Sequence, residues 1–188
     1  CSTVAQGVCE FSSQGLCTTA WAYAKMRVKH RPLMHSLAKA SIARISEFAP
    51  QNLANTAWSC ATMLYIHGPL MESISSASLT IITQFDAQHL CNLAWAFASL
   101  CYMDQPFMKA LAAQSFRILS EFTSVAMANM AWAFATWKFV DTPLITALAA
   151  EASTRISLFS SPGLANLAWS YSRMEILHVP LLTAIAAE

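Results

Sequence analysis

The sequence repeats one pattern five times at a fixed interval of 37 residues. Each copy is marked by one Phe, by one Trp ten positions later, and by one Pro eleven positions after the Trp. A fixed period in this range is typical of arrays in which small structural units stack on one another. The three columns are Phe11, Phe48, Phe85, Phe122 and Phe159; Trp21, Trp58, Trp95, Trp132 and Trp169; and Pro32, Pro69, Pro106, Pro143 and Pro180.

Each copy predicts two helices. A residue that favours the N-cap follows most of the Phe residues directly, as at Ser12 and Asp86, and the Pro column suits the first turn of a second helix. The Ala, Leu and Met content favours helix, and no run alternates with period two. We therefore expect an all-α fold, an α-solenoid of about five two-helix repeats in which the first helix lines the concave face. The expected repeats are 10–46, 47–83, 84–120, 121–157 and a partial 158–188, with 1–9 as the end of a preceding repeat.

Most of the repeated apolar columns are expected to form the core. An Ala precedes each Trp, and small side chains there let neighbouring helices approach closely. The Trp column is expected to fill the space between layers, together with the Phe and Met residues. This expectation leaves the polar columns of the first helix as the candidates for function.

The composition agrees with such an array and with a longer protein. Only 11% of the 188 residues are charged and 56% are hydrophobic, which a solenoid explains in part because neighbours cover two sides of each unit. The chain begins at Cys1 and stops at Glu188 inside a repeat, so we expect a single solenoid segment of a longer protein. The longest weakly polar stretch, 125–140, is shorter than the ~20 residues that a spanning helix needs, so no membrane insertion is expected.

Charge and cysteines restrict the classes of partner and cofactor. The net charge is +1, but residues 1–47 hold six basic and two acidic groups, whereas residues 48–188 hold five basic and eight acidic groups. A polyanion is thus favoured at the N-terminal end. The six Cys residues form no CxxC pair, and Cys17 and Cys91 occupy a column that holds Ala in the other copies. We expect a reducing compartment, no metal and no cofactor.

One polar face of the first helix is the candidate binding surface. In the second copy it is predicted to contain Asn52, Asn55, Ser59 and Thr62, at helical spacing and opposite the Leu and Ala positions. Its amides could hydrogen-bond the main chain of the next repeat, or read RNA with two or three side chains per base, or hold an extended peptide. The central column is a ladder one repeat apart, Asn55, Asn92, Asn129 and Asn166.

The repeat also carries a motif of a known family. The string Phe-x-Pro-Gln-x-Leu-Ala-Asn-x-Ala-Trp-x-x-Ala stands complete at 48–61, and Asp-x-Pro-Leu stands at 141–144. These units resemble the octotricopeptide and heptatricopeptide repeats of organellar RNA-binding proteins, which are related in style to proteins with a terminal RAP domain. Val125 and Pro162 depart from the Gln of the first three copies.

The resemblance implies an RNA-binding protein of the mitochondrion, with the plastid as the alternative. It implies a role in RNA processing, stabilisation or translation, within an organellar ribosome or another ribonucleoprotein. The implied partners are single-stranded or ribosomal RNA and other subunits of an organellar complex. If one repeat reads one base, about five bases would be addressed. The candidate RNA-binding residues are Asn55, Asn92, Asn129 and Asn166, assisted by Thr18, Gln51, Gln88, Lys25 and Arg173.

Catalysis is not expected of this segment. No phosphate-binding loop, GxSxG or HExxH motif occurs, and the acidic residues form no convergent pair. His30, His67 and His178 share one linker column with Asp104 and Asp141, which favours a role at the start of the second helix over a metal site. The alternative to RNA binding is a scaffold whose same surface binds other protein subunits.

Overall fold

The computed structural model describes residues 7, 8 and 10–188, and this part of the chain forms α-helices and single 3-10 turns with no strand. Residues 1–6 and 9, most of the predicted end of a preceding repeat, lie outside the described residues. The first helix of each repeat is called helix A here and the second is called helix B. The A helices are α2 (Ser13–Lys25), α4 (Pro50–Thr62), α6 (Ala87–Ser99), α8 (Ser124–Trp137) and α10 (Ser161–Arg173). The B helices are α3 (Arg31–Ala43), α5 (Gly68–Thr80), α7 (Gln105–Arg117), α9 (Thr142–Thr154) and α11 (Val179–Ala187).

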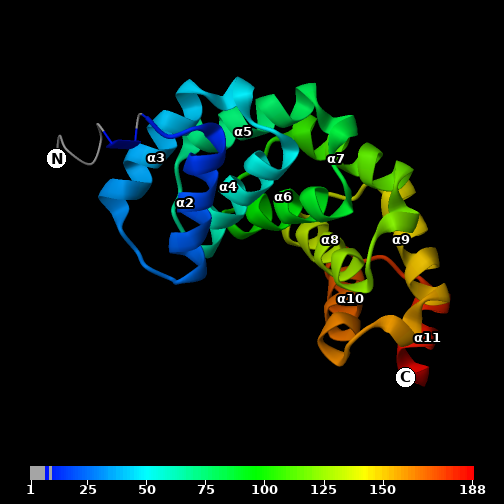
Figure 1. Cartoon of the computed structure of the whole chain (residues 1–188). Coiled ribbons are helices and arrows are strands. Elements are labelled where there is room, and N and C mark those ends of the chain that lie inside the picture. The colour runs from blue at the N-terminus through cyan, green and yellow to red at the C-terminus, as the bar shows by residue number, and fades with distance from the viewer. Residues whose placement is uncertain (1–6, 9) are drawn as a thin grey trace.

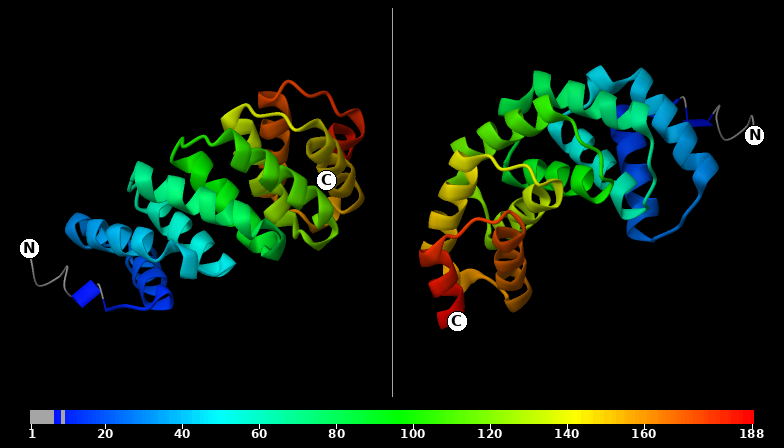
Figure 2. Two further views of the ribbon diagram at one scale, coloured as in Figure 1. Left: turned by 90° about the horizontal axis from the view of Figure 1, so that it is seen from above. Right: turned by 180° about the vertical axis from the view of Figure 1, so that it is seen from behind.

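The helices form two concentric layers of an arc. Figure 1 shows the B helices along the outer curve and the A helices along the inner curve, with the termini at opposite ends. Each A helix packs against the A helices before and after it, and each B helix covers the A helix of its own repeat. The views from above and from behind show the same stacking (Figure 2). The predicted all-α solenoid, with the A helices on the concave face, is confirmed.

Side chains at the predicted positions cap both kinds of helix. The Ser12 Oγ accepts the N–H of Gly15 at 3.1 Å, and an Asp86 carboxylate oxygen accepts the N–H of His89 at 2.8 Å. At the start of the B helices, His67 Nδ1 and an Asp104 carboxylate oxygen accept the third N–H of their helices at 3.2 and 3.0 Å. The prediction that this His and Asp column starts helix B is confirmed. Such caps satisfy N–H groups that a helix leaves unpaired.

Each A helix ends at a residue in the left-handed conformation, although none of these residues is Gly. In the second repeat, Leu64 has a φ of 53°. Its N–H donates to the Ala61 carbonyl at 3.0 Å, and the Tyr65 N–H donates to the Cys60 carbonyl at 2.8 Å. This pair of bonds is the Schellman arrangement, which usually takes Gly because a Cβ is unfavourable there. The residues are Arg27, Leu64, Cys101, Lys138 and Glu175.

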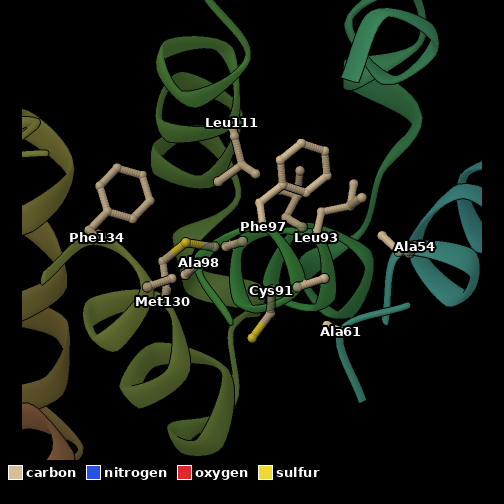
Figure 3. Close-up of a cluster of buried hydrophobic side chains, with 14 of the residues drawn as sticks. Ala54, Ala61, Cys91, Leu93, Phe97, Ala98, Leu111, Met130 and Phe134 are labelled. Atoms are coloured by element: carbon tan, nitrogen blue, oxygen red, sulfur yellow. The ribbon is translucent and has the colours of Figure 1, made fainter. Parts of the chain in front are cut away.

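The core lies between the two layers. Phe97 and Phe134 are fully buried on the side of the A helices that faces helix B, and Leu111 reaches them from α7. Figure 3 shows this cluster, with Met130 contributed by the next A helix. The Ala column that precedes each Trp is buried where α4, α6 and α8 meet their neighbours, as at Ala94. Small residues there allow the close helix contacts that the sequence predicted.

The prediction that the Trp column fills the space between layers is wrong for Trp21 and Trp169 and holds only in part for the three Trp residues between them, which pack against the core without being fully buried. Trp21 and Trp169 are 40% and 46% exposed, and the three Trp residues between them are only partly buried. The residue two positions after each Trp, such as Phe97, points to the core instead. The cause is helical phase. At about 100° per residue, Trp95 and Phe97 point in directions about 160° apart, so Phe97 faces helix B while the indole lies toward the inner curve.

Within the described part of the chain, no helix has both the length and the apolar character that crossing a membrane requires.

Candidate functional site

The inner curve presents a row of side chains that recurs in every A helix. In α4 the row consists of Gln51, Asn55, Trp58 and Thr62, at spacings of four, three and four residues. These spacings place all four on one helix face. The predicted face differs by about one position, because Asn52 and Ser59 are buried, and the Asn52 amide donates to the Gln14 side chain of the preceding A helix at 3.0 Å. The face that the structure presents therefore includes the predicted Asn column, and its centre lies closer to Trp than the sequence predicted.

The predicted RNA-binding residues all lie on A helices, in rows and not in one cluster. Asn55, Asn92 and Asn129 are partly buried along the middle of the inner curve, whereas Asn166 and Thr18 are exposed at its two ends. Exposed side chains flank this row on both sides. Gln51 and Gln88 lie in the first turns of their helices, and Lys25 and Arg173 lie in the last turns of α2 and α10.

The Asn side chains keep hydrogen-bonding capacity. Asn92 accepts from the Gln88 amide at 3.0 Å, which joins two predicted residues of the same helix. Asn55 and Asn129 lie beside the thiols of Cys17 and Cys91 in the preceding repeats. Burial raises the pKa of the Cys91 thiol to about 12, so this neighbour is uncharged. Within the described residues, no main-chain group binds the amide of any of the four Asn residues. Asn92 bonds Gln88, and Asn55 and Asn129 bond the thiols, so each amide keeps part of its hydrogen-bonding capacity.

Charge differs between the two edges of the inner surface. The edge at the ends of the A helices carries Lys25, Arg27 and Lys29, which are exposed and form no ion pair within the described chain. The opposite edge, at the helix starts, carries Asp86 and Glu121 around a hollow of about 230 Å³. A polyanion would therefore be attracted to the helix-end edge in the first repeat and repelled from the other edge.

The His residues of the linker column serve as caps. His67 Nδ1 accepts the N–H of Leu70 at 3.2 Å, which requires an unprotonated Nδ1. Partial burial lowers the pKa of His67, and the nearby His35 and Lys39 lower it further. Among the residues that the structure describes, no three His, Cys, Asp or Glu side chains come together in a way that could hold a metal ion.

Sequence reasoning missed two components of this surface. The Trp column was assigned to the core because Trp is usually buried, although the spacing Gln51, Asn55, Trp58 already placed it beside the polar columns. Arg27 and Lys29 were counted in the charge of the N-terminal end but were not assigned to a site. No sequence signal indicated that a left-handed turn would hold Arg27 at the edge of the inner surface.

The fold and this surface together define a class of protein: a helical-repeat solenoid whose concave face presents amides, hydroxyls and partly exposed indoles in register. The sequence matches the family described as the RNA-editing substrate-binding complex 6 protein over residues 3–141, which is well over half of the chain. The chain belongs to this family. A comparison with curated proteins found no match.

Proposed function

We propose that this protein binds single-stranded RNA along the inner curve of its A helices and does so as a subunit of an RNA-editing complex. It acts as a binding protein without catalysis of its own, and its compartment is the mitochondrion, with the plastid as the alternative. RNA processing is the role that the family name favours. Transcript stabilisation, translation and a place in an organellar ribosome are the other roles that the resemblance to organellar repeat proteins offers.

One observation carries the proposal: the inner surface repeats the same hydrogen-bonding and aromatic groups at intervals of one repeat. Asn92 and Asn129 take equivalent places on adjacent A helices, and Trp95 and Trp132 accompany them. Side chains that read RNA in helical repeats recur in this way, because successive bases are recognised by successive repeats. Aromatic groups beside them provide surfaces on which unpaired bases stack. A double-stranded RNA would not fit this scheme, because its bases are paired and stacked internally.

The low net charge of the described surface sets the expected mode of binding. Phosphate contacts supply much of the affinity of most RNA-binding proteins. Here the unpaired cations of the inner surface are concentrated near α2, so most repeats would contribute through bases and not through phosphates. We expect modest affinity and a shallow dependence on salt.

Filter binding of the full chain to labelled single-stranded RNA, at about 50 mM and about 200 mM salt, tests the proposal. Asn92→Asp combined with Asn129→Asp adds negative charge to the amide row while keeping the side-chain shape, and it should weaken binding. Ser76→Asp combined with Thr146→Asp adds the same charge to exposed positions of the B helices and should leave binding near the wild-type level. Equal losses in both double variants, or no retention of RNA by the wild-type chain, would reject the proposal.

A scaffold role is the second candidate, and a separate observation favours it. The loops between helices A and B present an apolar row in which Ile66 and Leu177 are 70% and 78% exposed. Met103 and Val140 occupy the same place in the repeats between them and are also exposed. Exposed apolar rows of this kind mark protein-binding surfaces. Ile66→Ser with Met103→Ser should then release a protein subunit from the native complex while leaving RNA retention unchanged.

A further inference from the structure

A hollow of about 450 Å³ opens at the edge of the inner surface where the first three repeats meet. It is lined from the α2–α3 loop by Arg27 and Lys29, from the end of α4 by Thr62, from the turn after α4 by Leu64, and from α6 by Trp95. Its volume falls within the range of small-ligand sites. Because three consecutive repeats contribute, the site exists only in the stacked array.

Trp95 provides a fixed aromatic wall. It is partly buried and packs against the hydrophobic core, so its ring is held in place while part of it lines the hollow. Ala61, which is buried at the end of α4, also lines the hollow, and its small side chain takes up little of the space. An aromatic ring that is both fixed and accessible is a surface on which a nucleobase can stack.

Two cations, Arg27 and Lys29, line the same hollow from the loop that follows α2. Arg27 takes the left-handed conformation, with a φ of 56°, and its N–H donates to the Ala24 carbonyl at 3.0 Å. The Val28 N–H closes the turn on the Tyr23 carbonyl, also at 3.0 Å. Neither Arg27 nor Lys29 forms an ion pair within the described chain, and no carboxylate lines the hollow. The site therefore favours an anionic ligand.

Thr62 supplies an unsatisfied polar atom at the same place. Its Oγ1 is buried and has no hydrogen-bond partner in the described structure. The equivalent hydroxyl in repeat four, Thr136 Oγ1, donates to the Trp132 carbonyl at 2.8 Å. A buried hydroxyl without a hydrogen-bond partner destabilises the folded state unless a ligand forms the missing hydrogen bond.

The neighbouring repeat shows that these features are local. One repeat further along, the places of Arg27 and Lys29 are taken by Leu64 and Ile66, and the indole there is Trp132. An aromatic wall thus recurs along the array, whereas among the described repeats the pair of cations occurs in the first alone, since Lys138 is followed by Val140. This difference singles out the hollow at Trp95 from the general RNA-binding surface.

We propose that this hollow is a subsite for one nucleotide of a single-stranded RNA. The base stacks on Trp95, the Thr62 hydroxyl bonds its edge or its ribose, and Arg27 and Lys29 neutralise the adjacent phosphates. The subsite rests on the proposed function, and it fixes the register of the strand at the first three repeats. The remaining inner surface then extends along the strand from this anchored nucleotide.

The test compares matched variants of the full chain on a labelled single-stranded RNA of about 12 nucleotides and mixed sequence. Trp95→Leu should weaken binding roughly 5- to 150-fold, and Trp132→Leu should weaken it distinctly less. Trp95→Phe keeps the aromatic face and should restore most of the affinity, which separates stacking from loss of folding. Arg27→Ala with Lys29→Ala should lower the slope of log affinity against log salt by about 1.4, whereas Lys109→Ala with Arg117→Ala on α7 should not change it.

The outcomes separate the subsite from the function on which it rests. If the wild-type chain binds RNA but Trp95→Leu and Trp132→Leu lose the same affinity, the subsite is rejected and the general RNA-binding surface stands. The same holds if the two cationic double variants have equal salt slopes. If the wild-type chain retains no RNA, both proposals fail.

Discussion

The ends of the first and second A helices have the same backbone but opposite surface chemistry. At both helix ends the backbone turns through a left-handed residue, and the same pair of hydrogen bonds closes the turn. In the first repeat this turn presents Arg27 and Lys29, and in the second it presents Leu64 and Ile66. Packing between repeats therefore fixes the backbone of each turn, whereas the turn side chains can differ. As a result, one repeat can bind a polyanion and another can bind an apolar partner.

The largest expected effect tests whether the second repeat is part of one packed core. Leu53 is fully buried on α4, so Leu53→Ala should lower the free energy of unfolding by about 2–5 kcal/mol. Leu158→Ala, at a position that is 62% exposed, should change it by no more than about 0.5 kcal/mol. Urea unfolding followed by circular dichroism measures both. A small loss at Leu53 would show that the repeats do not share the core described here.

Exchanging the turn side chains should transfer the binding property of the first repeat. Leu64→Arg with Ile66→Lys places two cations beside Trp132, and RNA affinity should rise roughly tenfold at about 0.1 M salt because two phosphate contacts are added. Leu64→Met with Ile66→Ser adds no charge, keeps an apolar side chain on the wall of the hollow at Trp95, and should leave affinity unchanged. A gain in this uncharged variant as large as in the charged variant would contradict the electrostatic explanation.

A smaller effect separates the backbone of the turn from its side chain. Gly accepts the left-handed conformation without the cost of a Cβ, so Leu64→Gly and Arg27→Gly should each stabilise the chain by up to about 1 kcal/mol. Arg27→Gly should also weaken RNA binding, because it removes one of the two cations that line the hollow at Trp95. Thermal unfolding and filter binding on the same samples measure the two effects, and destabilisation by either substitution would argue against the left-handed turn.

The smallest effect concerns pH and the caps of the B helices. Because the folded-state pKa of His67 lies below its ordinary value, the folded chain binds fewer protons than the unfolded chain. The contribution of His67 to stability is therefore fully present above the ordinary His pKa of about 6.5 and is lost as the pH falls through its lower folded-state pKa. His67→Asp supplies the kind of cap found at Asp104 and should remove this dependence. The melting temperatures of the wild-type chain and of His67→Asp at about pH 7.5 and about pH 5.5 measure this effect. The prediction is contradicted if the melting temperature of the wild-type chain stays constant while that of the variant changes.

Much of the fold could be predicted because the repeat presents the same local signals five times. The Phe followed by a capping residue, and the Pro in the first turn of helix B, fix helix starts by local hydrogen bonding. The caps at Ser12 and Asp86 formed as expected for this reason. The columns that face the core also follow from helical spacing.

The site could be predicted only in part, because it depends on small differences of phase and on contacts between repeats. Asn52 and Asn55 are three residues apart and both polar, yet the first is buried against the preceding A helix and the second remains partly open. The hollow at Trp95 requires side chains from three repeats, and the position of Arg27 in it depends on a left-handed turn. The residue pattern of a single repeat indicates neither the hollow nor the position of Arg27.

The most direct test of the account is ultraviolet crosslinking of the full chain to single-stranded RNA, followed by mass spectrometry of the crosslinked peptides. RNA held along the inner curve should crosslink to peptides of α2, α4 and α6, with Trp95 among the crosslinked residues, and the B helices should remain free of adducts. Crosslinks confined to α5, α7 and α9 on the outer curve would contradict the claim that the concave face binds RNA.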